Sequence, residues 1–277
     1  MWKKIERPLP RFLVADNSNT AILFVHGLGG SSKTWSDFSE RLDAEWTEKD
    51  NFNLEYDEYY KNYYNIPVFS FIVKSFMGKD INNLSKHLDS VIKTVCEKYE
   101  HVILICHSMG GLIARQYIVN KLKKDKNLGK IKALITYATP HLGSYIANYC
   151  RVIFHKPLAL LRIKKLLQVS DLSNNGDYIN KLNEDWSMLN INDKIDFIRV
   201  IGMEDWIVNT ASGEFINDEN VHYFANKDHF SIIKPNKNIK DPALYVSYNY
   251  LKDFNENLEK KQELDEFSFE EESDYEF

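Results

Sequence analysis

The sequence of 277 residues lacks the features that mark membrane, secreted or nucleic-acid-binding proteins. Its longest purely apolar runs hold about six residues, far fewer than the ~20 that a membrane-spanning helix needs. No continuous apolar stretch follows Lys3, Lys4 and Arg7 near the N-terminus, so no secretory signal is predicted. The net charge of −5 excludes a generally basic surface, and we therefore expect no nucleic-acid partner.

Cysteine is also scarce. The three cysteines, Cys96, Cys106 and Cys150, show no paired spacing, which favours reduced thiols and a cytoplasmic location. No set of cysteine and histidine residues has the spacing of a zinc site, and no segment resembles a calcium-binding EF-hand loop. The sequence therefore predicts no metal site.

Short apolar runs alternate with segments of helical periodicity through most of the chain. Hydrophobic residues make up 44% of the sequence, enough for a sizeable core. Alternating strands and helices favour a mostly parallel central sheet with helices on both faces, and they place any site along one edge of that sheet. We expect strands at 21–25, 66–73, 102–106, 131–138, 195–201 and 221–224, and helices at 80–99, 109–122 and about 241–258.

One segment departs from this alternation within a predicted domain of residues 1–252. The stretch at about 142–193 is too long for an ordinary connection, and we interpret it as a lid insertion that folds over the sheet edge. After Pro157 it can form a basic amphipathic helix, which either packs over the site or contacts anionic lipid at a membrane surface.

Residues 253–277 carry 11 acidic and 2 basic side chains, a net charge of −9. We expect a solvated, disordered acidic tail. The alternative is that its aromatic residues Phe267, Phe269, Tyr275 and Phe277 anchor a protein partner.

The strongest local signal is the segment Cys106-His107-Ser108-Met109-Gly110-Gly111, between a predicted buried strand and an amphipathic helix. A serine at such a sharp strand-to-helix turn projects its hydroxyl above the sheet, and the residues two places away must be small. Gly110 meets that demand, and Cys106 is compact although glycine is usual there. Ser108 is therefore the candidate nucleophile, the alternative being a serine that only caps the helix.

The second signal is Phe24-Val25-His26-Gly27-Leu28-Gly29-Gly30, directly after another predicted strand. Its glycines let the backbone turn and expose N–H groups, which would face the oxyanion in an ester-cleaving enzyme. We assign the N–H groups of Leu28 and Met109 as the two donors, and we place His26 and Gly27 beside the substrate. The alternative of phosphate binding is weaker, because neither G-x-G-x-x-G nor G-K-[ST] occurs.

The segments HGLGG, HSMGG and Thr139-Pro140-His141-Leu142-Gly143-Ser144 resemble those of lipase-like serine esterases of the α/β-hydrolase superfamily. The motifs span roughly residues 20 to 235. The resemblance implies the α/β-hydrolase fold with an eight-strand-type mixed sheet, a Ser–acid–His triad in that chain order, and no cofactor.

The resemblance also implies where the acid and the base lie. Asp205 matches the aspartate of a G-x-x-D-x-[IV]-V pattern, with Glu204 or a surface acidic turn as alternatives. His229 lies in a stretch similar to H-[FST]-S-I-x-K-P around the catalytic histidine of related esterases, the alternative being a capping or surface histidine. Adjacent side chains diverge, so Asp228 is not expected to orient His229.

His141 follows a central strand, where it either lines the substrate site or forms a structural hydrogen bond. Together these features predict a serine hydrolase that cleaves a carboxylic ester, lipid-like or small, through an acyl-enzyme. An acyltransferase or thioesterase would use the same triad. A non-catalytic protein-interaction module of the same fold, binding through the lid and the tail, is the alternative from another class.

Overall fold

The structure is a computed structural model of the whole chain. It describes residues 2–4, 19–27, 34–49, 56–61, 79–97, 99–143, 172–208, 210–214, 220–236 and 240–273. Among these residues, no helix has both the length and the apolar character to cross a membrane.

A seven-stranded sheet forms the centre of the described part of the chain, with the strand order β1-β3-β2-β4-β5-β6-β7. Only the edge strand β1 runs antiparallel to its neighbour, so the other strands end at one common edge. The strands are β1 (Trp2–Lys4), β2 (Thr20–Val25), β3 (Tyr56–Lys61), β4 (His101–His107), β5 (Ile131–Tyr137), β6 (Asp196–Gly202) and β7 (Val221–Phe224).

Five predicted strands occur in the structure with shifts of at most one residue at either end, and they are β2, β4, β5, β6 and β7. The strand predicted at 66–73 lies outside the described residues. In β2 all six residues are buried, as expected for a parallel strand covered on both faces. The resemblance implies an eight-strand-type sheet, and the sheet of the described residues has seven strands.

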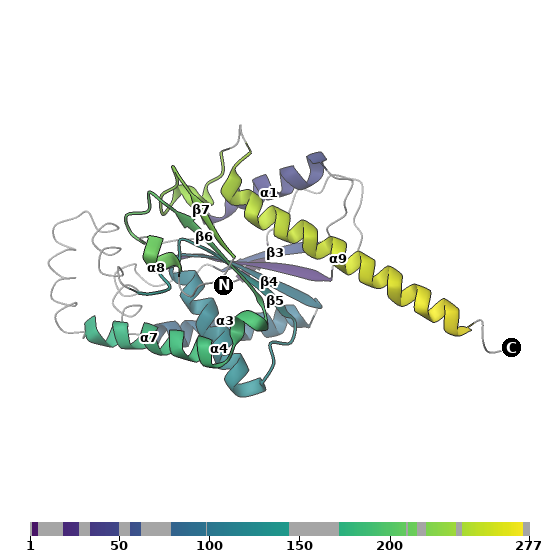
Figure 1. Ribbon diagram of the computed structural model, residues 1–277, viewed down its shortest axis with the longest axis horizontal. Coiled ribbons are helices and arrows are strands. Elements are labelled where there is room, and N and C mark those ends of the chain that lie inside the picture. Colours follow the sequence, from purple (N-terminus) through teal and green to yellow (C-terminus); the bar gives the residue numbers. More distant parts are fainter. Residues whose placement is uncertain are drawn as a thin grey trace.

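Helices cover both faces of the sheet (Figure 1). On one face α3, α4 and α7 enclose one hydrophobic core, and on the other face α1 and α9 enclose a second. The helices are α1 (Ser36–Lys49), α3 (Lys79–Cys96), α4 (Met109–Asp125), α7 (Leu172–Met188), α8 (Thr210–Glu214) and α9 (Pro242–Ser273), and the 3-10 turns are η2 (Ile191–Asp193) and η3 (Ser231–Ile233).

The described end of the segment predicted as a lid insertion at 142–193 contributes to the core. Helix α7 packs against α4 and buries Ile179, Leu182 and Trp186, each at most 2% exposed. Their spacing of three and four residues gives α7 one apolar stripe in an otherwise polar helix, and this stripe is buried against the body. The basic segment at 151–169 lies outside the described residues.

The expectation of a disordered tail from residue 253 is wrong for residues 253–273, which continue α9 beyond the body of the molecule (Figure 1). The helix is anchored where Leu244 and Leu251 are buried against the sheet. Once nucleated there, it extends through a segment without glycine or proline. The side-chain pairs Lys252–Glu256 and Asn255–Glu259 support it at a spacing of four residues.

Candidate active site

Ser108 lies on a sharp turn between β4 and α4. Its backbone has φ 54° and ψ −129°, in the left-handed half of conformational space that a non-glycine residue rarely adopts. The turn is held from β5, because the Ser108 N–H donates to the Tyr137 carbonyl at 2.8 Å and the Thr139 hydroxyl donates to the Ser108 carbonyl at 2.9 Å. The predicted nucleophile therefore stands at the edge where the parallel strands end.

Two glycines allow the close approaches on which this turn depends. A Cβ atom at Gly110 would lie 2.4 Å from the Val25 carbonyl oxygen, so α4 begins in direct contact with the end of β2. A Cβ atom at Gly27 would lie 2.6 Å from the Ser108 Cβ atom. Cys106 is fully buried, and desolvation raises the pKa of its thiol well above the ordinary value. Position 106 thus accommodates a compact thiol side chain in place of glycine.

The structure brings Ser108, His229 and Asp205 together. The His229 Nε2 atom lies 3.1 Å from the Ser108 Oγ atom, and the His229 Nδ1 atom lies 2.9 Å from the Asp205 Oδ2 atom. A carboxylate only accepts hydrogen bonds, so Nδ1 carries the hydrogen, and in the neutral ring Nε2 is left to accept from the serine hydroxyl. All three side chains are buried, and the His229 side chain is 0% exposed.

The loop after β6 orients Asp205. The Asp205 Oδ1 atom accepts hydrogen bonds from the backbone N–H groups of Ile207, at 2.9 Å, and Val208, at 2.8 Å. The carboxylate is thereby fixed with Oδ2 directed at His229. Glu204, the competing acid, is exposed, so the geometry favours Asp205 as the partner of the imidazole.

The loop that carries His229 is stabilised on both sides. The Asp228 Oδ1 atom accepts from the N–H groups of Phe230, at 2.8 Å, and Ser231, at 2.7 Å, which starts the turn η3. Burial acts to raise the pKa of Asp228, but these hydrogen bonds outweigh it and the pKa lies below the ordinary value. Lys227 donates to the Ser231 carbonyl and forms a half-buried ion pair with Asp241 at the start of α9. Asp228 thus shapes the loop instead of orienting the ring.

Of the two predicted oxyanion donors, Met109 lies in the described part of the chain. Met109 is the first residue of α4, where backbone N–H groups have no partner within the helix. Leu28 lies outside the described residues. Its neighbour Gly27 packs against Ser108, which brings the start of that loop to the nucleophile.

His26 and His141, predicted beside the substrate, are both buried. The His26 Nδ1 atom lies 2.8 Å from the Gly27 carbonyl oxygen. The His141 ring nitrogens lie 3.3 Å from an Arg115 Nη1 atom and 3.1 Å from the Thr136 Oγ1 atom. Both ring nitrogens of His141 are thus directed at protein groups. This arrangement favours a structural hydrogen bond over a place in the lining of the substrate site.

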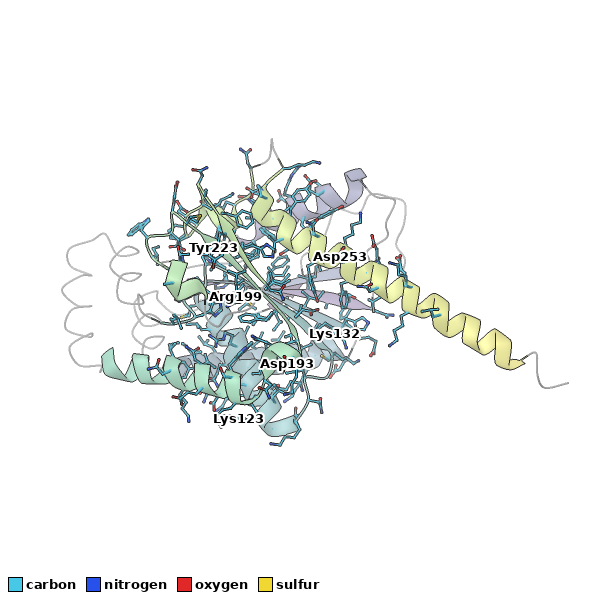
Figure 2. The ribbon with its side chains drawn as sticks, viewed as in Figure 1. Lys123, Lys132, Asp193, Arg199, Tyr223 and Asp253 are labelled. Carbon is cyan, nitrogen blue, oxygen red and sulfur yellow. The ribbon has the colours of Figure 1, made fainter. Side chains whose placement is uncertain are left out.

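The buried polar cluster around Arg115 was not predicted from the sequence. Arg115, on α4, is fully buried, donates to Asn183 at 2.9 Å, and its guanidinium stacks on the Trp186 ring. Burial lowers the pKa of Arg115 to about 9. Arg199 lies in the same interior, among the packed side chains at the centre of Figure 2. A charged residue at a core position of a helix is the signal by which Arg115 could have been found.

His107 was also missed, because it lies inside the serine motif. Its side chain is buried, and its Nε2 atom lies 2.8 Å from the backbone carbonyl oxygen of His229. The part of the chain that the structure describes contains no group of three or more His, Cys, Asp or Glu side chains that could hold a metal ion.

Comparison with known protein families and sequences identifies relatives. The sequence profile described as "PGAP1-like alpha/beta domain" matches residues 16–159. Protein SERAC1 from Danio rerio is 24% identical over an alignment of 261 residues that covers 81% of this chain and 37% of that protein. Triacylglycerol lipase 2 from Saccharomyces cerevisiae is 35% identical over 104 residues, which are 38% of this chain and 30% of that protein. The chain spans about a third of the length of these curated relatives.

Solved structures share the fold. The mature form of Bacillus licheniformis lipase BlEst2 aligns over 90% of this chain and 98% of its own, with a TM-score of 0.55 and 19% identity. A lipase-esterase related protein from Clostridium acetobutylicum aligns over 92% of this chain and 98% of its own, with a TM-score of 0.52 and 15% identity. Together with the strand order, these likenesses confirm the predicted α/β-hydrolase fold.

Proposed function

Because the chain belongs to the family of PGAP1-like alpha/beta domains, a lipase-like family of α/β hydrolases, we propose that it is a serine hydrolase that cleaves carboxylic esters. The observation that carries the proposal is the unbroken chain of contacts from the Ser108 hydroxyl through His229 to Asp205. Such a constellation activates a serine hydroxyl that is otherwise a weak nucleophile.

In the proposed reaction, His229 Nε2 takes the proton of Ser108 as the Oγ atom bonds to the acyl carbon. The carbonyl oxygen becomes an oxyanion, and the alcohol leaves with the proton that His229 returns. Water then attacks the acyl-enzyme while His229 takes its proton. The acid product departs as Ser108 regains its hydrogen. Asp205 holds the ring in the required tautomer and stabilises its charged form.

The oxyanion is assigned to the N–H groups of Met109 and Leu28. The start of α4 supports the first assignment, because the helix dipole and the N–H groups of its first turn favour negative charge there. The packing of Gly27 on Ser108 supports the second. One such donor is typically worth about 10²- to 10³-fold in rate.

For the substrate we propose a lipid-like ester, because one relative is a triacylglycerol lipase by name. Acyl transfer and thioester cleavage use the same machinery and remain alternatives that depend on the acceptor. We also propose that the basic segment at 151–169 contacts anionic lipid and that the acidic residues at 253–277 bind a protein partner. A cytoplasmic location fits Cys96 and Cys106, which are free thiols in the structure.

A panel of nitrophenyl esters of increasing acyl length, run beside a phospholipid and a triacylglycerol, tests this function. We expect wild-type turnover and its loss in Ser108→Ala. Ser247→Ala, which also removes a buried hydroxyl but lies on α9 and contacts Tyr137, is the matched control and should retain activity. Equal activity of wild type and Ser108→Ala would contradict the proposal. Turnover that needs an added alcohol or thiol acceptor would identify a transferase.

A further inference from the structure

We propose that His107 is a positioning residue that holds the backbone of His229 at the distance from Ser108 that proton transfer requires. This inference rests on the proposed function, and it assigns a task to the residue directly before the nucleophile. The His107 side chain takes no part in the proton transfers proposed for Ser108, His229 and Asp205.

The contact that carries the proposal joins two loops far apart in the sequence. The His107 Nε2 atom lies 2.8 Å from the carbonyl oxygen of His229, 122 residues later. A carbonyl oxygen only accepts, so His107 presents Nε2–H as the donor. Because His107 and Ser108 are consecutive, this one hydrogen bond ties the main chain of the base to the strand that ends at the nucleophile.

The surroundings of His107 allow it little movement. Its side chain is buried, and its ring centroid lies 6.4 Å from that of Trp35 in an edge-on arrangement and 4.8 Å from that of His229. Trp35 is itself 0% exposed and packs on Phe24 and Phe38. The donor is therefore fixed by a packed aromatic cluster, as expected of a group that sets the position of another.

The protonation state of His107 suits this task. Burial first, and the neighbouring His229 second, hold the pKa of His107 well below its ordinary value. His107 is then neutral near pH 7, so it does not oppose the positive charge that His229 acquires when it takes the serine proton.

The opposite side of His229 is held by different means. Asp205 fixes the ring through Nδ1, and the turn begun by Asp228 fixes the residues that follow. Removing the His107 hydrogen bond would take away this tie between the His229 main chain and the end of β4, and we expect the ring to shift relative to Ser108. A displacement near 1 Å in such a constellation can lower the rate about 10²-fold.

The test compares two substitutions of His107. His107→Gln retains an N–H donor at similar reach, whereas His107→Leu fills much of the space without a donor, with His107→Met in its place should the leucine variant be too unstable to purify. We expect the apolar variant to lose about 10²-fold in kcat with KM changed less than about twofold, and the glutamine variant to recover most of the loss.

Tyr137→Phe is the matched control. Tyr137 pairs with His107 in the sheet, and its buried hydroxyl bonds Ser247 and the Ala243 carbonyl, so its loss lowers stability in the same layer without removing a contact of the triad. We expect its kcat to stay within about twofold of wild type. An equal fall of kcat in the apolar, glutamine and control variants, or an apolar variant with wild-type kcat, would overturn the proposal.

A readout without turnover separates this proposal from the proposed function. The Nδ1 proton of His229, bound to Asp205, should give a low-field proton NMR signal in wild type and His107→Gln, and a weakened or absent one in the apolar variant. An unchanged signal in the apolar variant would refute positioning even if no ester were cleaved. Absence of turnover with the expected NMR differences would instead refute only the esterase function.

Discussion

Replacing Gly27 by alanine should impair the chemistry far more than the fold. The added Cβ atom would lie 2.6 Å from the Ser108 Cβ atom and 3.1 Å from both the Ser108 Oγ atom and the His107 carbonyl oxygen. Ordinary contact begins at 3.4 Å, so Ser108 and Gly27 must separate by about 0.8 Å. A shift of that size is close to the 1 Å misplacement that can cost about 10²-fold in rate. The associated overpacking should lower stability by about 1–3 kcal/mol.

The measurement is kcat and KM on a soluble nitrophenyl ester, with the free energy of unfolding from urea titration. Gly213→Ala is the matched control, because its Cβ atom would meet the Ile201 Cδ1 atom at 2.8 Å, the movable end of a side chain. We expect Gly213→Ala to lose some stability and to retain kcat. If Gly27→Ala kept wild-type kcat while losing stability to the same extent, the argument that this contact positions the nucleophile would be refuted.

Asp205→Asn should lower kcat about 10³- to 10⁴-fold, because an amide directed at Nδ1 of His229 favours the wrong tautomer. Glu204→Gln should leave kcat unchanged. Loss of kcat in Glu204→Gln but not in Asp205→Asn would assign the orienting role to Glu204 instead. Burial holds the pKa values of His107 and His141 well below that of an unfolded histidine. The unfolded chain therefore binds more protons below about pH 6.5, and stability is lost as the pH falls through that value. Between pH 7 and pH 5.5 the two histidines together should remove about 2–3 kcal/mol from the free energy of unfolding. Urea titrations at both pH values measure this loss, and His141→Gln should reduce it by about half; a pH dependence unchanged by that substitution would contradict the assignment.

The buried strands could be predicted because each is a short apolar run bounded by polar residues, as in Thr20–Val25 and His101–His107. Strand β3 (Tyr56–Lys61) was missed because Asp57 and Glu58 interrupt its tyrosines, and no apolar run marks it. Helix α7 was assigned to a lid because the length of the segment outweighed its one apolar stripe. The extension of α9 was missed because the charge of residues 253–277 favoured disorder, whereas the anchored first turns propagate the helix.

The predicted site residues Ser108, Asp205 and His229 could be named because each follows a strand in a recognisable local pattern. Contacts that depend on the tertiary structure could not be inferred in this way. The bond from His107 to the His229 carbonyl joins a side chain to main chain 122 residues away, and no local pattern encodes it. The burial of Arg115 against Trp186 likewise depends on how α4 and α7 pack.

The central claim, that Ser108 is a nucleophile activated by His229, is tested most directly by a fluorophosphonate probe followed by mass spectrometry of the peptides. We predict one adduct per chain on Ser108, with labelling abolished in Ser108→Ala and strongly slowed in His229→Ala. Labelling at another residue, or labelling of the wild type no faster than that of Ser108→Ala, would contradict the account.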